Sequence, residues 1–237
     1  MQIEHTEFQD QMVRGLTHRM NNILTLFTGH VGLLLENQQL DAPTQQALLK
    51  IKDGAQAASE LMDRTHSLVR PSTLVWREID LGEFVSRLIP GFEALRVRDA
   101  QLEIDAQEGL PHVWGDMGRI KTAIFELVRN AFDASPSGGT VRIELRAEAL
   151  VRTASAASQP IRWVSLTVSD EGPGVPSETV EKIFAPFFTL KQKQDAAGLG
   201  LTVALGFVQQ LGGAIRYRRD AGRTVFEIVL PSRCDPR

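Results

Sequence analysis

The fold of this 237-residue chain is decided by the stretch Glu126-Leu-Val-Arg-Asn-Ala-Phe-Asp-Ala134. Its apolar residues recur at three- and four-residue spacing, and no helix breaker precedes Pro136, so the stretch predicts an amphipathic helix. Glu126, Asn130 and Asp133 share one stripe of that helix, where carboxylate and carboxamide oxygens can hold a hard cation. A solvated polar face is the ordinary interpretation of such a stripe, but the glycine-rich segments that follow it favour a ligand site.

The composition excludes several classes of protein. A formal net charge of −3 gives no basic footprint for nucleic acid or for an anionic membrane. The single cysteine, Cys234, excludes an intramolecular disulfide and fits a reducing compartment. No apolar run approaches the ~18 residues of a membrane-spanning helix, and the N-terminus lacks the basic and apolar regions of a signal peptide. We therefore expect a soluble, cytoplasmic protein that neither binds nucleic acid nor inserts into a membrane.

The first seventy residues predict an antiparallel pair of helices. Apolar side chains recur every three or four residues between about Thr6 and Asn37, at Leu16, Met20, Ile23, Phe27, His30 and Leu34. After a turn at Asp41-Ala-Pro43 a second segment keeps the same spacing to Val69. A helical hairpin cannot bury both stripes alone, and heptad-like spacing suits a four-helix bundle built by two chains. We therefore expect a homodimer, with residues 1–70 as the dimerisation domain and 71–78 as a linker.

The remainder, residues 79–233, predicts an α+β sandwich. Helices are expected from Leu81 to about Arg98, after Gly115-Asp116, and from about Gly198 to Leu211. Alternating apolar residues predict strands around 102–104, 141–145, 164–168, 214–218 and 224–230. We expect a mixed, mostly antiparallel sheet with the helices on one face.

Glycines and single charges follow these elements in an order that points to nucleotide binding. Asp170 ends a strand and precedes Gly172 and Gly174, which let the backbone approach a flat ring or a phosphate. Gly198-Leu-Gly200 frees backbone amides at the start of a helix, where phosphate binds favourably. Lys191 can place a positive charge on a terminal phosphate. A single glycine pair is weak evidence, but the ordered set is strong.

This order of motifs resembles the catalytic core of a two-component sensor histidine kinase, over roughly residues 8 to 231. His18-Arg-Met-Asn-Asn22 resembles the H box of that family, and Glu126 to Ala134 resembles its N box. The later boxes correspond to 170–174 (G1), 183–191 (F) and 198–201 (G2), and residues 222–231 are similar to the usual family ending. The fold that this implies is a dimeric helical hairpin followed by a Bergerat-type ATP-binding domain.

The resemblance also implies roles for individual residues. His18 would attack the γ-phosphate of ATP and then pass the phosphoryl group to an aspartate of a response regulator. Asn130 would ligate Mg²⁺ with Glu126 close by, and Asp170 would accept a hydrogen bond from the adenine amino group. The remaining residues assigned to the nucleotide site are Asp133, Gly172, Gly174, Phe188, Lys191, Gly198, Leu199 and Gly200.

The chain departs from the family pattern at two places. Arg19 stands where the family has an acid directly after the phosphoacceptor, and an arginine cannot serve as a general base. General-base assistance is worth roughly 10²–10⁴-fold, so we expect slow autophosphorylation unless the change is compensated elsewhere. Asp195-Ala-Ala197 replaces a further glycine before Gly198, which predicts a stiffer lid.

Three activities remain open. The first is an ATP-dependent histidine kinase that takes its signal from a separate sensor protein. The second is a phosphotransfer or phosphatase protein with weak or no autokinase activity, because Arg19 replaces the usual acid. Asn22 supports it, since this position orients water for dephosphorylation in the family. The third is a dimeric scaffold that uses ATP only as a conformational ligand. Gyrase- and chaperone-like ATPases share the expected second domain but lack the His18 hairpin.

Overall fold

The computed structural model describes residues 2–36, 40–69, 74–97, 99–151, 161–191 and 198–232. The chain divides into two compact units, one formed by 1–72 with 189–199 and the other by 73–188 with 200–237. Within the described ranges, no helix is both long enough and apolar enough to cross a membrane.

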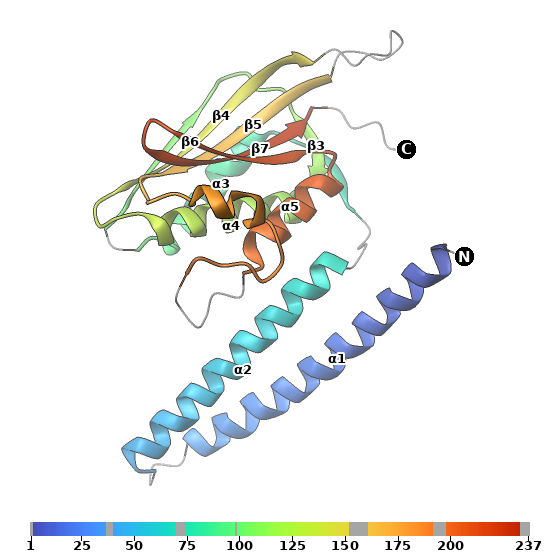
Figure 1. The fold of residues 1–237 in the computed structure, drawn as a ribbon, viewed down its shortest axis with the longest axis vertical. Coiled ribbons are helices and arrows are strands. Elements are labelled where there is room, and N and C mark those ends of the chain that lie inside the picture. The colour runs from blue at the N-terminus through green and yellow to red at the C-terminus, as the bar shows by residue number, and fades with distance from the viewer. Residues whose placement is uncertain are drawn as a thin grey trace. The chain divides into compact units, whose positions relative to one another are not determined.

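The first unit is built on a pair of long helices, α1 (Gln2–Leu35) and α2 (Ala42–Val69), which form the predicted antiparallel hairpin (Figure 1). Asp41 begins α2, because its Oδ1 accepts a hydrogen bond of 3.1 Å from the Thr44 amide. Pro43 lies in the first turn, where its missing N–H costs nothing.

The apolar stripe predicted for α1 is not the face that α1 buries within one chain. Val31 is 6% exposed, and Leu24, Thr28 and Leu35 are half-buried at the same heptad spacing. In contrast, Phe27 is 55% exposed. Leu26, Leu33 and Leu34 are also exposed, by 51–65%. A single hairpin therefore leaves a second apolar face of α1 open, next to the one turned toward α2.

The second unit is the predicted α+β sandwich. Its five-stranded sheet has the order β2-β4-β5-β7-β6, with β2 and β4 parallel and the other pairs antiparallel. The strands are β2 (Gln101–Ala106), β4 (Thr140–Val151), β5 (Ile161–Asp170), β6 (Ala214–Asp220) and β7 (Arg223–Pro231). One face is covered by α3 (Leu81–Ala94), α4 (Met117–Ala134) and α5 (Gly200–Gln210) (Figure 1).

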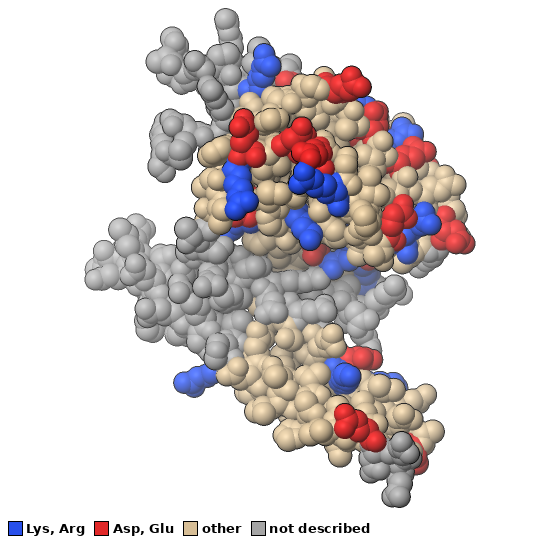
Figure 2. Space-filling view, turned by 180° about the vertical axis from the view of Figure 1, so that it is seen from behind, with Lys and Arg blue, Asp and Glu red and all other residues tan. Residues whose placement is uncertain are grey.

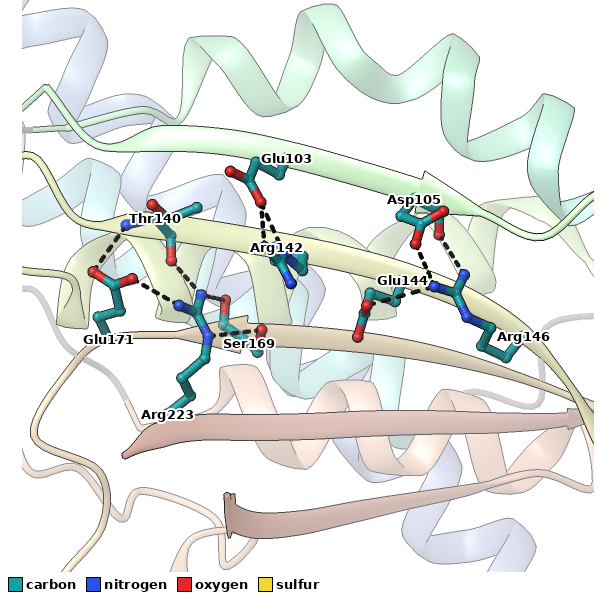
Figure 3. Close-up of polar contacts among 9 residues, drawn as sticks. All are labelled: Glu103, Asp105, Thr140, Arg142, Glu144, Arg146, Ser169, Glu171 and Arg223. Atoms are coloured by element: carbon teal, nitrogen blue, oxygen red, sulfur yellow. Dashed lines mark hydrogen bonds and ion pairs between the residues drawn. The ribbon is translucent and has the colours of Figure 1, made fainter. Parts of the chain in front are cut away.

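The two faces of the sheet differ as period-two alternation requires. On β4, Val141, Ile143 and Leu145 are fully buried against the helices, while Arg142 and Arg146 point to the opposite face. On that face Arg142 pairs with Glu103 and Arg146 pairs with Asp105 of the parallel neighbour β2 (Figure 3).

A small second sheet lies outside the sequence-based expectation. Strands β1 (Trp76–Ile79) and β3 (Val113–Asp116) pair antiparallel, and β1 begins inside the stretch predicted as a linker. Asp116 then serves two elements: its Oδ1 caps α4 at the Arg119 amide (3.1 Å), and its Oδ2 accepts from the Val75 amide (2.9 Å). A short 3₁₀ helix, η1 (Ser177–Lys182), was also not predicted.

Acidic and basic side chains are interspersed on the surface. In Figure 2 the blue and red groups of the larger unit alternate over the face shown, without a broad field of either sign. This distribution agrees with the small net charge of −3.

Candidate nucleotide-binding site

Helix α4 carries the stripe that the sequence singles out. Its Asp116 cap fixes the first turn, and its apolar residues are buried in the core. Glu126 is only 7% exposed, and Asn130 and Asp133 are half-buried. The stripe is therefore not a solvated polar face. A nearly buried carboxylate needs a partner, since desolvation of an isolated charge is costly.

At one end of this stripe, Glu126 lies against the start of α5. The carboxylate forms an ion pair with Arg129, one turn along α4. A Cβ on Gly200 would overlap Glu126 Oε2 and would lie 3.3 Å from Arg129 Nη2. Only glycine allows this close approach, so the first residue of α5 is held against the carboxylate of α4.

At the other end, the C-terminus of α4 meets the loop that follows β5. Asp170 is 2% exposed, and its Oδ1 accepts a 2.7 Å hydrogen bond from the Gly172 amide. A Cβ on Gly172 would lie 2.6 Å from Asp170 Oδ1 and 2.7 Å from the Ala134 carbonyl oxygen. The loop can pass between the carboxylate and the helix end only because residue 172 has no side chain.

The electrostatics of Asp170 combine opposing effects. Burial raises the pKa of this carboxyl above the ordinary aspartate value, while the Gly172 amide, the Thr224 hydroxyl and the charges of Arg219 and Arg223 lower it. Burial is the larger effect, so the direction is upward. When it is ionised, the Asp170 carboxylate acts only as a hydrogen-bond acceptor, and the Gly172 amide and the Thr224 hydroxyl donate to it.

Helix α4 therefore joins two chemically different places. From Glu126 to Ala134 the axis rises about 12 Å, at ~1.5 Å per residue. One end presents oxygen donors and the start of a helix, which suit a metal ion and phosphates. The other end presents the buried Asp170 acceptor beside Gly172, which suits an amino group on a flat ring. The residues present fit a magnesium-bound nucleotide.

The loops beyond Asp170 are held to the same unit. Gly174 adopts a positive φ of 79°, and the next amide, Val175, donates to Tyr217 Oη at 3.1 Å. Thr202 Oγ1 of α5 donates to the Phe184 carbonyl at 3.0 Å. Phe188 is half-buried against the core of this unit. The structure thus places Gly174, Gly200 and Phe188 on the unit that carries Asp170.

The remaining predicted site residues belong to the first unit. Asn22 lies on α1 and is exposed, while the side chain of His18 is outside the described residues. Lys191, Gly198 and Leu199 fall in the 189–199 segment, and the Asp195–Ala197 departure also lies outside the description. Gly198 has a positive φ of 65°, which suits the glycine predicted there.

Sequence reasoning missed three residues around Asp170. Thr224 and Arg223 lie in the tail that resembles the family ending, but that resemblance assigned them no role. Arg219 had no local signal at all. Thr224 reaches Asp170 because the ladder places β7 beside β5, and Arg219 reaches Thr224 because β6 lies beside β7, which is a tertiary arrangement. Arg223 acts on Asp170 through its charge.

A known protein family matches the part of the chain that carries α4 and Asp170. The family described as histidine kinase-, DNA gyrase B- and HSP90-like ATPase matches residues 115–233. The sensor kinase CckA of Brucella abortus is 33% identical over 228 residues, which cover 93% of this chain and 24% of CckA.

Two solved structures share the fold over nearly the whole chain. Full-length ShkA, in complex with AMPPNP, superposes with a TM-score of 0.70 at 20% identity, over 93% of this chain and 45% of ShkA. Histidine kinase ThkA, in complex with the response regulator TrrA, gives a TM-score of 0.66 at 20% identity, over 99% of this chain and 65% of that chain. The chain spans only 24% to 50% of the length of curated relatives that it matches.

Proposed function

Because the chain belongs to the histidine kinase-, DNA gyrase B- and HSP90-like ATPase family, as a two-component histidine kinase catalytic core, we propose that it transfers the γ-phosphoryl group of ATP to His18 and then to an aspartate of a response regulator. The observation that carries this proposal is the arrangement along α4. The buried acceptor Asp170 lies beside Gly172 at one end, and a stripe of side-chain oxygens that can ligate a metal leads to the start of α5 at the other.

In this proposal Asp170 recognises the base. One carboxylate oxygen is already bonded to the Gly172 amide, and the carboxylate can accept a further hydrogen bond from the adenine amino group. Gly172 and Gly174 leave room for the ring. Burial of the acceptor makes the pairing selective, because a base without a donor would leave a buried carboxylate unsatisfied.

The phosphates would lie toward Glu126 and Asn130. These two residues would hold Mg²⁺ with Asp133 near them, and the ion would supply charge neutralisation for the phosphates. The amides at Gly198, Leu199 and Gly200 and the Lys191 ammonium would bind the phosphate oxygens.

His18 would be the nucleophile on α1. The neutral form of its imidazole would be the one that attacks the γ-phosphate. Arg19 cannot accept the ring proton as an acidic neighbour would, so the reaction should be slow relative to a kinase that has the acid.

The partners follow from the same assignment. We propose a homodimer through residues 1–70, which would cover the open apolar face of α1. ThkA has been solved with the regulator TrrA, and a receiver domain is the corresponding partner proposed here. The input would come from a separate sensor, and the reaction would take place in the cytoplasm.

The test is incubation of the purified chain with γ-labelled Mg·ATP, comparing the wild type with His18→Ala. We expect acid-labile, base-stable label in the wild type and none in the variant. Label that persists in His18→Ala would exclude this histidine as the acceptor.

A second candidate is favoured by one observation: Arg19 occupies the position of the usual acid, while Asn22 occupies the family position that orients water for dephosphorylation. A protein that has lost the acid but kept the amide would act mainly as a phosphatase or phosphotransfer protein. It would give no label of its own while still binding ATP. Asn22→Ala should then slow dephosphorylation of the phosphorylated regulator, and an unchanged rate would exclude that role. Unchanged signalling by His18→Ala in cells would instead indicate a scaffold.

A further inference from the structure

The hairpin between β6 and β7 places a row of three side chains beside the base site. In the ladder Arg219 of β6 lies opposite Thr224 of β7, and Thr224 lies opposite Asp170 of β5. Residues directly opposite one another in a sheet point to the same face. All three side chains therefore lie on the helix-covered face, next to the end of α4.

Hydrogen bonds run along this row in one direction. Arg219 Nη1 donates to Thr224 Oγ1 at 2.8 Å and to the Gly172 carbonyl at 2.8 Å. A guanidinium can only donate, so the Thr224 oxygen must accept from it. The threonine proton is then left for the Asp170 carboxylate, with which the hydroxyl is hydrogen-bonded.

The same guanidinium fills the inside of the loop. A Cβ on Gly174 would lie 2.8 Å from Arg219 Nη1, so the glycine backbone rests on the arginine side chain. Arg219 thus contacts Gly172 and Gly174, the two glycines that flank the base site, and reaches Asp170 through Thr224. No other arginine in the described residues has this combination of contacts.

We propose that Arg219 is a positioning residue that makes the site selective for adenine over guanine. By fixing the Thr224 proton toward Asp170 and holding the Gly172 carbonyl, it keeps the carboxylate oriented as an acceptor. Adenine offers an amino donor at the position where guanine offers a carbonyl acceptor. A fixed acceptor therefore discriminates between the two bases, and this inference rests on the proposed binding of ATP at Asp170.

Arg223 provides a matched control from the same hairpin. Its side chain lies on the opposite face of the sheet, bonded to Glu171 Oε1 (2.7 Å), the Thr140 carbonyl (2.6 Å) and Ser169 Oγ (3.3 Å) (Figure 3). It ties the strand ends together but does not orient Thr224. Its loss should cost stability without changing which base is preferred.

The experiment is calorimetric titration of the full chain with Mg·ADP and Mg·GDP. In Arg219→Met we expect ADP affinity to fall about tenfold while the weak GDP affinity changes little, so the ADP/GDP ratio falls by about the same factor. Arg219→Lys should recover part of the ratio, because an ammonium can still donate. Arg223→Met should keep the wild-type ratio.

The pH dependence of binding gives a second readout. Arg219 and Arg223 are the charges that favour ionised Asp170, while α4 turns the Ala134 carbonyl toward this loop. Arg219→Met removes one charge and the fixed hydroxyl, so the acid limb of ADP binding should move to higher pH. A purely structural defect would weaken ADP and GDP alike and leave that limb in place.

The outcomes separate the two levels of inference. An unchanged ADP/GDP ratio in a folded Arg219→Met overturns the role of Arg219. If that variant does not fold, Thr224→Val removes the same relay and must show the same loss of ratio. If the wild type binds no ADP, or Asp170→Asn binds it equally well, the proposed nucleotide site itself is wrong.

Discussion

Asp170 shows how a recognition residue can work against the stability of the free protein. Its carboxyl is almost fully buried, and burial raises its folded-state pKa above the unfolded value. A group shifted upward stabilises the fold below its unfolded pKa, and that contribution is lost as the pH rises through the folded pKa. Above the folded-state pKa the free protein holds a buried, ionised carboxylate that lacks the hydrogen-bond donor which a bound ligand would supply.

Asp170→Asn should therefore stabilise the free protein while abolishing nucleotide binding. We expect its melting temperature to exceed that of the wild type by a few degrees at pH 7–8, because a neutral amide has no buried charge. The difference should disappear in acid, below the raised pKa, where the wild-type carboxyl is protonated. Thermal unfolding across pH measures this.

Asp220→Asn is the control for that series, because Asp220 is exposed at the turn of the neighbouring hairpin. It should leave both the melting temperature and its pH dependence unchanged. An Asp170→Asn protein that is less stable than the wild type at pH 8 would contradict the argument.

Gly172→Ala tests the close approach of the loop to α4. Its Cβ would lie within 2.7 Å of both the Asp170 carboxylate and the rigid Ala134 carbonyl, so the loop must move. We expect a loss of about 1–3 kcal/mol in unfolding free energy, as in overpacked sites, together with weaker nucleotide binding.

Gly82→Ala is its matched control in the same unit. A Cβ there would be 3.4 Å from Asp80 Oδ1, an ordinary contact, and alanine favours the helix. Denaturant unfolding should show equal or higher stability for this variant. Equal losses in both variants would remove the steric argument.

At the scale of elements, local signals predicted most of what positions the site. Asp116 and the apolar spacing predicted the start and the extent of α4, because helix capping and periodicity act within a few residues. The two short strands β1 and β3 were missed, since four residues carry little alternation and their partners are far apart in sequence. Arg219 was missed for the same reason, because only strand pairing brings it to Asp170.

The double role of Asp116 gives a prediction at this scale. Asp116→Ala removes the α4 cap and the hydrogen bond from Val75, whereas Asp80→Ala removes the single amide cap of α3 at Glu83. Loss of a cap costs about 0.5–2 kcal/mol. We expect Asp116→Ala to lose more stability than Asp80→Ala, by denaturant unfolding.

The two caps should also differ in function. Only Asp116 holds the helix that carries Asn130, so only Asp116→Ala should weaken binding of Mg·ADP. Equal effects of the two substitutions on nucleotide affinity would show that α4 does not depend on its cap for positioning.

At the scale of the whole molecule, the open face of α1 predicts association of two chains. Phe27 and Leu34 are more than half exposed in a single chain, on the stripe that heptad spacing marks. Phe27→Glu should convert a dimer to a monomer, because a buried charge without a partner is costly. Sedimentation velocity measures the change.

Gln56→Glu is the control, an exposed position on α2 that lies off the predicted stripe. It adds the same charge and should leave the mass unchanged. A wild-type chain that sediments as a monomer at micromolar concentration, or a Phe27→Glu variant that remains a dimer, would rule out this interface.

The pairing of β1 with β3 decides where this molecule can be cut. A fragment that starts at Ile79, the domain start predicted from the sequence pattern, would leave β3 without most of β1 and Asp116 without the Val75 amide. A fragment that begins upstream of Val75 would retain both. The nucleotide-binding domain would then be best isolated by a cut early in the predicted linker, before Val75. The end of that linker is already part of the folded domain, because Val75 is bonded to Asp116, the cap of the helix that carries Asn130.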